Sequence, residues 1–160
     1  MISNLHAEYP DAFFLDPELF HAVFGTSKRQ PMIGADWHER LYAFIGGICR
    51  DLGAQLIAGN GMEDHAHLLV RYPPDLAHAV LLREVKARSS RWIHETFAEQ
   101  QSFAWQRGYG GFTVSKSNVP EVEQYIREQA AHHRFMSFED EFLALLRKHE
   151  VEFDPRYVFE

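Results

Sequence analysis

The spacing of hydrophobic and polar positions changes several times along the chain, and each change predicts a different element. Residues 19–26 (LFHAVFGT) alternate and are rich in bulky side chains, which is typical of a strand. Residues 36–53 place apolar side chains at helical spacing between an acidic start and a glycine stop, which predicts a helix. Residues 54–61 and 65–72 are two strand-like runs joined by a short turn-rich connection, so we expect them to pair as a hairpin.

Helical spacing returns in the middle of the chain. Residues 74–97 begin with Pro and Asp, and their apolar positions recur at roughly helical spacing, which predicts a long helix. These positions are Leu76, Val80, Leu81, Val85 and Trp92. Residues 103–117 are aromatic and rich in glycine, and we expect a strand at GFTVS (111–115) within them.

Two more helices are expected in the C-terminal part. Residues 119–135 follow Asn118 and open with Pro and Glu, and residues 137–150 have the Ser-x-x-Asp spacing of a capping box. The order strand, helix, strand, strand, helix, strand predicts an α+β protein with the ferredoxin-like split β-α-β fold, in which helices cover one face of an antiparallel sheet. The helix at 119–135 is then a candidate to lie on the free face or against a partner.

Length and composition add a few limits. The 160 residues contain no repeat or flexible linker, so we expect one domain over 1–160, with residues 1–18 as an acidic N-terminal extension. The single cysteine, Cys49, excludes an intramolecular disulfide and a cysteine-based zinc site, and it favours the reduced cytoplasm. No apolar run approaches the roughly 20 residues that cross a bilayer, so we expect no membrane association.

The formal net charge of −7 argues at first against a nucleic-acid partner, because Lys and Arg provide most of the affinity for phosphates. The distribution changes this picture, since residues 65–120 carry seven basic and four acidic side chains while both flanks are acidic. The segment is either an ordinary solvated helix surface or a local phosphate-binding face. Its basic side chains include Arg83, Lys86, Arg88, Arg91, Arg107 and Lys116.

Two histidines, His65 and His67, lie at the start of the predicted strand 65–72. Residues two apart in a strand point to the same side, so the imidazoles lie next to each other while Ala66 faces the opposite side. Such a pair either chelates a divalent cation or consists of partly buried histidines that are hydrogen-bonded to the backbone. Two nitrogen atoms do not complete a metal site, so a third ligand has to come from elsewhere.

The predicted helix 119–135 offers a candidate for the third ligand. Tyr125, Gln129 and His133 are four residues apart and therefore share one helical face. Residue type alone favours packing and solvent contacts for the Tyr and the Gln. His132 and His133 are ambiguous, because cations near a helix C-terminus are favourable for electrostatic reasons alone.

Five segments, in this order and at these separations, resemble the single-tyrosine HUH transposases of small bacterial insertion sequences, the IS200-like transposase family. They are EDHAHLLV, KARSSRW, WQRGYGGFTVS, VEQYIREQAAHHRFMSFEDEF and FDPRYVF. The resemblance extends from about FHAVFGTSKRQP to near the C-terminus. REP-associated tyrosine transposases are kin of this family, but the Pro-Asn that we associate with that branch is missing before the first histidine, which favours the mobile-element type.

The resemblance implies a role for each of the residues singled out above. In similar proteins the two histidines and the Gln one turn after the tyrosine bind Mg²⁺ or Mn²⁺, which implies His65, His67 and Gln129 as metal ligands here. Tyr125 would be the nucleophile that attacks a phosphodiester of single-stranded DNA, leaving a 5′-phosphotyrosine bond and a free 3′-hydroxyl. Because one ester is exchanged for another, the strand can be rejoined without ATP.

The resemblance also implies the partners. They are single-stranded DNA with hairpin ends and a second copy of the chain, in a homodimer whose subunits complete each other's active sites with the tyrosine helix. For contacts to the DNA backbone we expect Lys86, Arg88, Arg91, Arg107 and Lys116. Bases stack on aromatic rings, for which Trp105, Tyr109 and Phe112 are candidates, although core packing explains these three equally well.

The leading hypothesis is therefore a metal-dependent DNA transposase that cuts and rejoins one strand. One alternative is a domesticated or non-catalytic protein that binds single-stranded DNA hairpins with the same fold. Another is a metal hydrolase that uses activated water, which would still cleave DNA after Tyr125→Phe and would form no covalent adduct.

Overall fold

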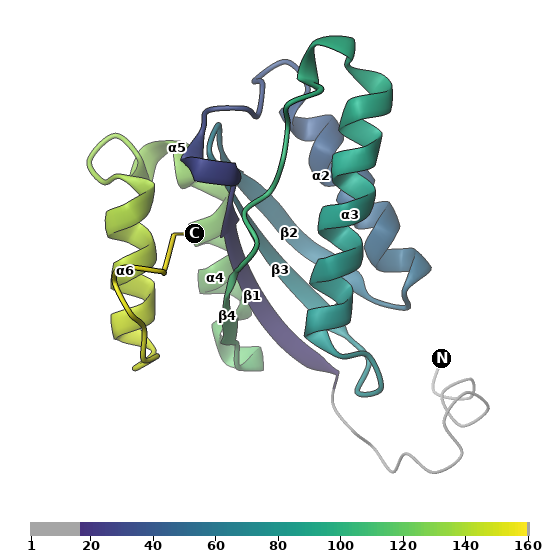
Figure 1. Ribbon diagram of the computed structural model, residues 1–160. Helices are drawn as coiled ribbons and strands as arrows, with labels where there is room; N and C mark the ends of the chain where they lie inside the picture. Colours follow the sequence, from purple (N-terminus) through teal and green to yellow (C-terminus); the bar gives the residue numbers. More distant parts are fainter. Residues whose placement is uncertain (1–16, 160) are drawn as a thin grey trace, which may run out of the picture.

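A computed structural model describes residues 17–159 of the chain, and a four-stranded antiparallel sheet lies at its centre (Figure 1). The strands are β1 (Glu18–Gly25), β2 (Gln55–Met62), β3 (His65–Tyr72) and β4 (Gly110–Thr113). Their order across the sheet is β2-β3-β1-β4, so β1 and β3 are central. This is the predicted split β-α-β arrangement, in which the hairpin β2–β3 is separated from β4 by β1.

Helices α2 (His38–Asp51) and α3 (His78–Thr96) cover one face of the sheet. Ala66, Leu68 and Val70 of β3 point toward these helices and belong to the main hydrophobic core, as the alternation along a strand requires. Helix α3 begins four residues after the expected start. Pro73 to Leu76 form a turn closed by a hydrogen bond from the Leu76 N–H to the Pro73 carbonyl, and the helix follows it.

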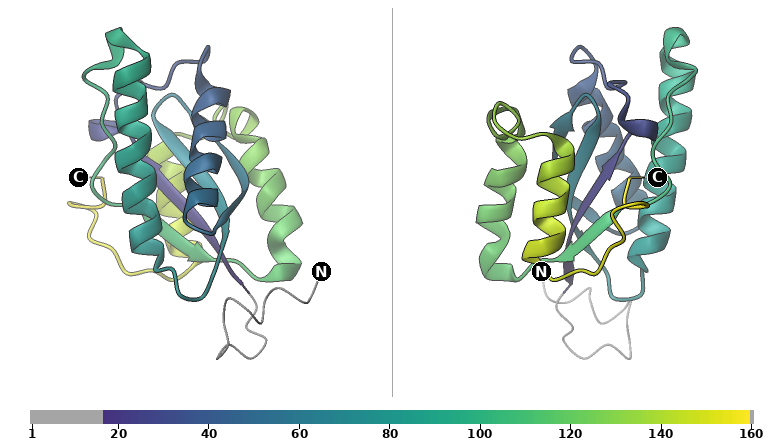
Figure 2. Two further views of the ribbon diagram at one scale, coloured as in Figure 1. Left: turned by 90° about the vertical axis from the view of Figure 1, so that its right-hand side faces the viewer. Right: turned by 60° about the vertical axis from the view of Figure 1, so that its left-hand side comes forward.

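The opposite face of the sheet is covered by α4 (Val119–Arg127), α5 (Gln129–His132) and α6 (Phe138–Lys148), with α4 and α6 side by side (Figure 2). Three short 3₁₀ turns connect elements, at Ser27–Arg29, Ala98–Gln100 and Lys116–Asn118. Ile126 of α4 packs on Ala58 and Leu69, and Phe138 and Phe142 of α6 pack with Val23 and Phe112. The sheet is therefore buried between two helical layers, and the second layer is the C-terminal one.

The single helix expected over 119–135 is wrong, because the structure breaks it at Glu128. The chain contains no Gly or Pro at this break. Across the fold, the Asn60 side chain of β2 donates hydrogen bonds to the carbonyls of Ile126 (3.0 Å) and Arg127 (3.1 Å) at the break. These carbonyls lose their helical partners at the break, and Asn60 satisfies them.

Most of the expected N-terminal extension, residues 1–16, lies outside the described residues, and Glu18 already belongs to β1. Among the helices of residues 17–159, none has the length and apolar character needed to span a bilayer.

Candidate metal and nucleophile site

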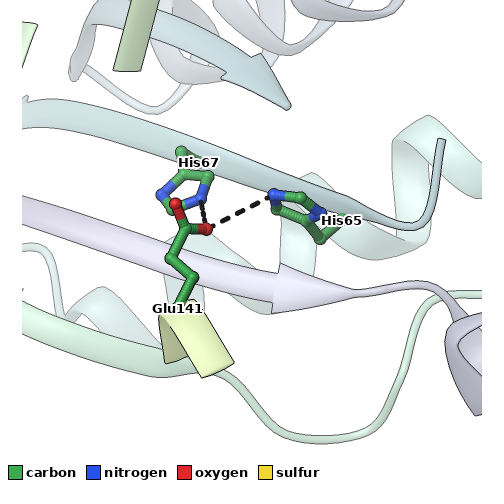
Figure 3. A group of neighbouring side chains, drawn as sticks. All are labelled: His65, His67 and Glu141. Carbon is green, nitrogen blue, oxygen red and sulfur yellow. Dashed lines mark hydrogen bonds and ion pairs between the residues drawn. The ribbon is translucent and has the colours of Figure 1, made fainter. Parts of the chain in front are cut away.

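His65 and His67 lie at the start of β3 and point to the side of the sheet that faces the C-terminal helices (Figure 3). Both side chains are fully buried. They reach a carboxylate that the sequence analysis did not single out, that of Glu141 in α6. The Glu141 Oε1 atom lies 2.8 Å from His67 Nε2 and 3.5 Å from His65 Nε2.

Helix α6 places Glu141 by ordinary capping and packing. Ser137 caps the helix, since its hydroxyl accepts a hydrogen bond from the Asp140 N–H, as the capping-box pattern predicts. Phe138 and Phe142 pack against the sheet, and the Phe138 ring stacks on His65 with centroids 4.3 Å apart. Glu141 is three residues after Phe138, so the two side chains lie on one side of the helix, and Glu141 is buried there.

Gln129 and His133 contribute two more polar groups to this cluster. Gln129 Oε1 lies 3.1 Å from His65 Nε2 and 3.1 Å from His133 Nε2. His133 Nε2 is also 3.2 Å from Glu141 Oε1. Gln129 is fully buried, and the break before it allows α5 to reach the ends of β2 and β3.

Two further side chains orient the histidines of β3. Asp64 Oδ1 lies 2.7 Å from His65 Nδ1, and His21 Nε2 of β1 lies 2.9 Å from His67 Nδ1. A carboxylate only accepts hydrogen bonds, so Asp64 Oδ1 accepts one from His65 Nδ1–H and turns the Nε2 side of the ring into the cluster. Second partners of this kind fix the ring orientation of metal-binding histidines.

Tyr125 of α4 joins the cluster through its hydroxyl, which donates a hydrogen bond of 2.5 Å to Glu141 Oε2. The ring of His132 packs against the Tyr125 ring with centroids 4.7 Å apart, and the rings of His21 and His67 approach it edge-on. Glu141 therefore bridges the tyrosine and the histidine pair, with one carboxylate oxygen toward each.

Burial governs the ionisation of these groups. Burial raises the pKa of Tyr125 well above its ordinary value, and the hydrogen bond to the Glu141 carboxylate raises it further. Burial also raises the pKa of Glu141, but the hydrogen bonds from His67 and Tyr125 and the attraction to nearby imidazoles outweigh it, so the pKa ends well below its usual range. Burial lowers the pKa of His67, and it lowers that of His21 to about 3.

This donor set suits a divalent cation. Ligand atoms of His65, His67 and Glu141 all lie within 4.8 Å of one another, and Gln129 Oε1 is beside them. Among the described residues, His65, His67 and Glu141 are the His, Cys, Asp or Glu side chains whose ligand atoms come this close together in a group of three. Imidazole nitrogen, carboxylate and amide oxygen are ligands of Mn²⁺ and related ions, and the carboxylate offsets the positive charge in a buried site.

The basic residues expected to contact DNA lie elsewhere and are divided among three surfaces. Lys86 and Arg107 line a hollow of about 480 Å³ between α3 and residues 104–109. The Lys86 ammonium donates hydrogen bonds to the carbonyls of Gln106, Arg107 and Gly108 in its wall, and burial lowers its pKa to about 8.

Arg88 and Arg91 line a second hollow, of about 550 Å³, between α2 and α3. Arg88 is paired with Glu84 and Asp51 there. Lys116 follows β4, at the sheet edge. The structure does not bring these five basic residues together at the cluster of His65 and Glu141.

The aromatic candidates for base stacking are mostly core residues. Trp105 is 9% exposed, packs edge-on against Phe24, and donates from its indole to Ser89. Phe112 is 3% exposed and packs in the core beneath α6. Tyr109 is partly buried and lines the hollow that contains Lys86.

Four residues of the cluster were missed or left ambiguous by the sequence analysis. Glu141 carried a signal, since it is an acid on the apolar face of residues 137–150. Asp64 is the neighbour of His65 in the chain, so its contact with His65 could also have been predicted from the sequence. His21 gave no local signal, because it reaches His67 only through the pairing of β1 with β3. His133 was noted, but its contacts depend on the break in the predicted helix.

Comparison with known proteins agrees with the resemblance. A family model described as "Transposase IS200 like" matches residues 18–129, from the first strand to the buried glutamine of the cluster. The chain belongs to this IS200-like transposase family. The transposase of insertion sequence element IS200 from Salmonella typhimurium is 24% identical over 115 residues, which are 69% of this chain and 75% of that protein. The ISDra2 transposase TnpA of Deinococcus radiodurans is 22% identical over 115 residues, 69% of this chain and 82% of that protein.

A solved relative confirms the fold of this IS200-like family member. A REP-associated tyrosine transposase bound to a REP hairpin superposes with a TM-score of 0.59 at 15% identity, covering 78% of this chain and 73% of that one. The family match ends at residue 129, so His133 and Glu141 lie beyond it.

Proposed function

We propose that this transposase cuts and rejoins single-stranded DNA through a 5′-phosphotyrosine intermediate at Tyr125, with a divalent cation held by His65, His67, Glu141 and Gln129. The observation that carries the proposal is the Glu141 carboxylate, which lies 2.5 Å from the Tyr125 hydroxyl and 2.8 Å from His67. A buried carboxylate shared between a tyrosine and a donor set that suits a metal ion is an arrangement typical of catalytic sites.

In the proposed reaction the Tyr125 phenol gives its proton to Glu141 Oε2, its hydrogen-bond acceptor, and its oxygen attacks phosphorus. The bond from phosphorus to the 3′-oxygen breaks, and the 3′-oxygen takes up a proton and leaves as the 3′-hydroxyl. A 3′-hydroxyl attacking the phosphotyrosine reverses the step and rejoins the strand. Glu141 Oε2 accepts the hydrogen bond of the phenol and so points the nucleophile. Asp64 and His21 hold the imidazoles. Mg²⁺ or Mn²⁺, when bound, supplies stabilisation of the negative charge that develops on the phosphate oxygens.

A labelled single strand that carries a hairpin, incubated with protein and Mn²⁺ or Mg²⁺ and run on a denaturing gel, tests this proposal. We expect a slowly migrating protein–DNA adduct that disappears in Tyr125→Phe and persists in the control Tyr157→Phe, since Tyr157 is 58% exposed. Cleavage by Tyr125→Phe without an adduct would indicate a hydrolase. Binding without cleavage by the unaltered protein would indicate a DNA-binding protein.

The described cluster is complete within one chain, because Tyr125 contacts the Glu141 of its own chain. We therefore propose that the tyrosine acts in cis, whether or not the expected homodimer forms. Mixing Tyr125→Phe with His65→Ala protein tests this. A site shared between subunits would regain about a quarter to a half of the cleavage, whereas a cis site regains none.

Hairpin DNA is proposed as the partner, supported by the solved relative that is bound to a REP hairpin. Lys86, Arg88, Arg91, Arg107 and Lys116 remain predicted phosphate contacts. Each true contact that is removed should lower the slope of log affinity against log salt by about 0.7 for a single strand. Arg107→Ala is the clearest variant, because Arg107 is exposed.

A further inference from the structure

A hollow of about 160 Å³ opens beside Tyr125, between β4, α4 and α6. Its floor is aromatic, because the rings of His21, Phe112 and Tyr125 line it. The His149 ring at the end of α6 lies 4.4 Å from the Phe112 ring, measured between centroids, and forms one side of the rim. His21 and Phe112 are only 4% and 3% exposed, so the partly exposed ring of Tyr125 and the exposed ring of His149 are the surfaces that a planar ring can contact.

The rim of the hollow carries both hydrogen-bond donors and acceptors. Asn118 and Glu121 come from the start of α4, and Lys148 comes from the end of α6. Within residues 17–159, these three side chains make no hydrogen bond or ion pair, whereas the polar side chains of the neighbouring metal cluster are engaged with one another. An amide, a carboxylate and an ammonium around an aromatic floor match the edge and the face of a nucleobase rather than a phosphate alone.

The position of the hollow selects which nucleotide reaches it. In the proposed reaction the Tyr125 oxygen becomes bonded to the 5′-phosphate of the nucleotide on the 3′ side of the cleaved bond. The base of that nucleotide is tethered to Tyr125 through one sugar and one phosphate. One face of the Tyr125 ring is covered by His132, while the ring also lines the hollow, so the hollow lies beside the residue to which the base is tethered.

We infer that this hollow, lined by Phe112, Tyr125, His149, Asn118, Glu121 and Lys148, binds the base that follows the cleaved phosphate. The inference rests on the proposed function and adds to it a protein-built pocket for one unpaired base. About 160 Å³ corresponds to the room of roughly five water molecules, which suits one base and excludes a base pair.

The first test replaces that base by 2-aminopurine, whose emission falls when it stacks on aromatic rings. With the position of cleavage mapped on the denaturing gel, we expect quenching on binding when 2-aminopurine follows the cleaved phosphate, and much less when it lies three positions further on. Equal emission in free and bound DNA at the first position would overturn the inference.

The second test is a double-mutant cycle between protein and DNA. Removing the base at this position should slow cleavage about 5- to 150-fold, the usual effect of losing one stacked base. Lys148→Ala should slow cleavage of the intact strand, and it should have a clearly smaller effect on the abasic strand. Arg147→Ala is the matched control, because this exposed neighbour on α6 does not line the hollow.

If the effects of Lys148→Ala and base removal on the cleavage rate multiply, the two changes act independently. That result would refute the base pocket, even where the Tyr125 adduct forms normally. Absence of an adduct with every strand would instead remove the proposed function, and this inference with it.

Discussion

Replacing Glu141 by glutamine tests the residue that joins the tyrosine to the histidine pair. The carboxylate accepts one hydrogen bond from His67 at 2.8 Å and one from Tyr125 at 2.5 Å. Glutamine has the same shape but a single oxygen, so it accepts only one of these bonds and turns an N–H toward the other donor. A hydrogen bond to a charged group contributes about 1.5–3 kcal/mol. We therefore expect the metal-free variant to lose about 2 kcal/mol of unfolding free energy.

For a chain of this length, a loss of about 2 kcal/mol lowers Tm by about 4–8 °C, which thermal denaturation followed by circular dichroism in EDTA measures. Glu139→Gln is the matched control. Glu139 lies in the same helical turn, but its side chain is 49% exposed and pairs with Arg29 at the surface. A surface ion pair contributes about 0–1 kcal/mol, so the control should change Tm by less than about 4 °C.

The dependence on pH provides a second measure. The pKa of Glu141 is lower in the folded protein than its ordinary value of 4.5. A carboxyl of this kind stabilises the fold at pH values above its unfolded pKa, and the stabilisation is lost as the pH falls from there toward the folded pKa. The Tm difference between the unaltered protein and Glu141→Gln should therefore be full at pH 6–7 and shrink below about pH 4.5.

Added Mn²⁺ separates the structural role from the proposed ligand role. A cation at 100 times its Kd stabilises a folded protein by about 2.7 kcal/mol, which here corresponds to about 5–11 °C in Tm. The unaltered protein should show this increase, and Glu141→Gln a clearly smaller one. The reasoning is refuted if the metal-free variant is as stable as the unaltered protein and Mn²⁺ raises both Tm values equally. Uncharged replacements of buried charges sometimes give that result.

Two further predictions concern the supports of the site. Asp64→Ala should weaken Mn²⁺ binding, measured by calorimetry, about 10- to 100-fold. Asp64→Asn should weaken it about 3- to 10-fold, because the amide oxygen still accepts a hydrogen bond from His65 but lacks the charge that roughly doubles the strength of the bond. Equal Mn²⁺ affinities of the unaltered protein and both variants would contradict this. Gly110→Ala should destabilise the protein and lower Mn²⁺ affinity, since its new methyl group meets the Phe142 ring beside Glu141. The control Gly47→Ala in α2, whose new methyl group meets only the end of the Arg50 side chain at an ordinary contact distance, should stabilise the protein by about 0.5–1 kcal/mol in a urea titration. If Gly110→Ala changed neither the stability nor the Mn²⁺ affinity, α6 would be shown to shift freely.

The periodic part of the fold was predictable from the sequence. Strand alternation and helical spacing are local properties, and they predicted the four strands, α2, α3 and α6 with errors of a few residues at their ends. The same local rules placed His65 and His67 on one side of a strand and Tyr125 and Gln129 on one helical face. Ser137 marked the start of α6 for the same reason.

The tertiary structure decided which of these surfaces meet. Glu141 enters the cluster because α6 packs its phenylalanines on the sheet, and the carbonyls that the helix break at Glu128 leaves free are bonded by Asn60 of β2. His21 reaches His67 only through the register of β1 against β3. Spacing along the chain carries no information about such contacts, since they depend on how separate elements pack rather than on the period within one. The sequence alone therefore determined the elements and their polar faces, and only the packing of α6 on β1 and β4 decided that a carboxylate joins the tyrosine to the histidines.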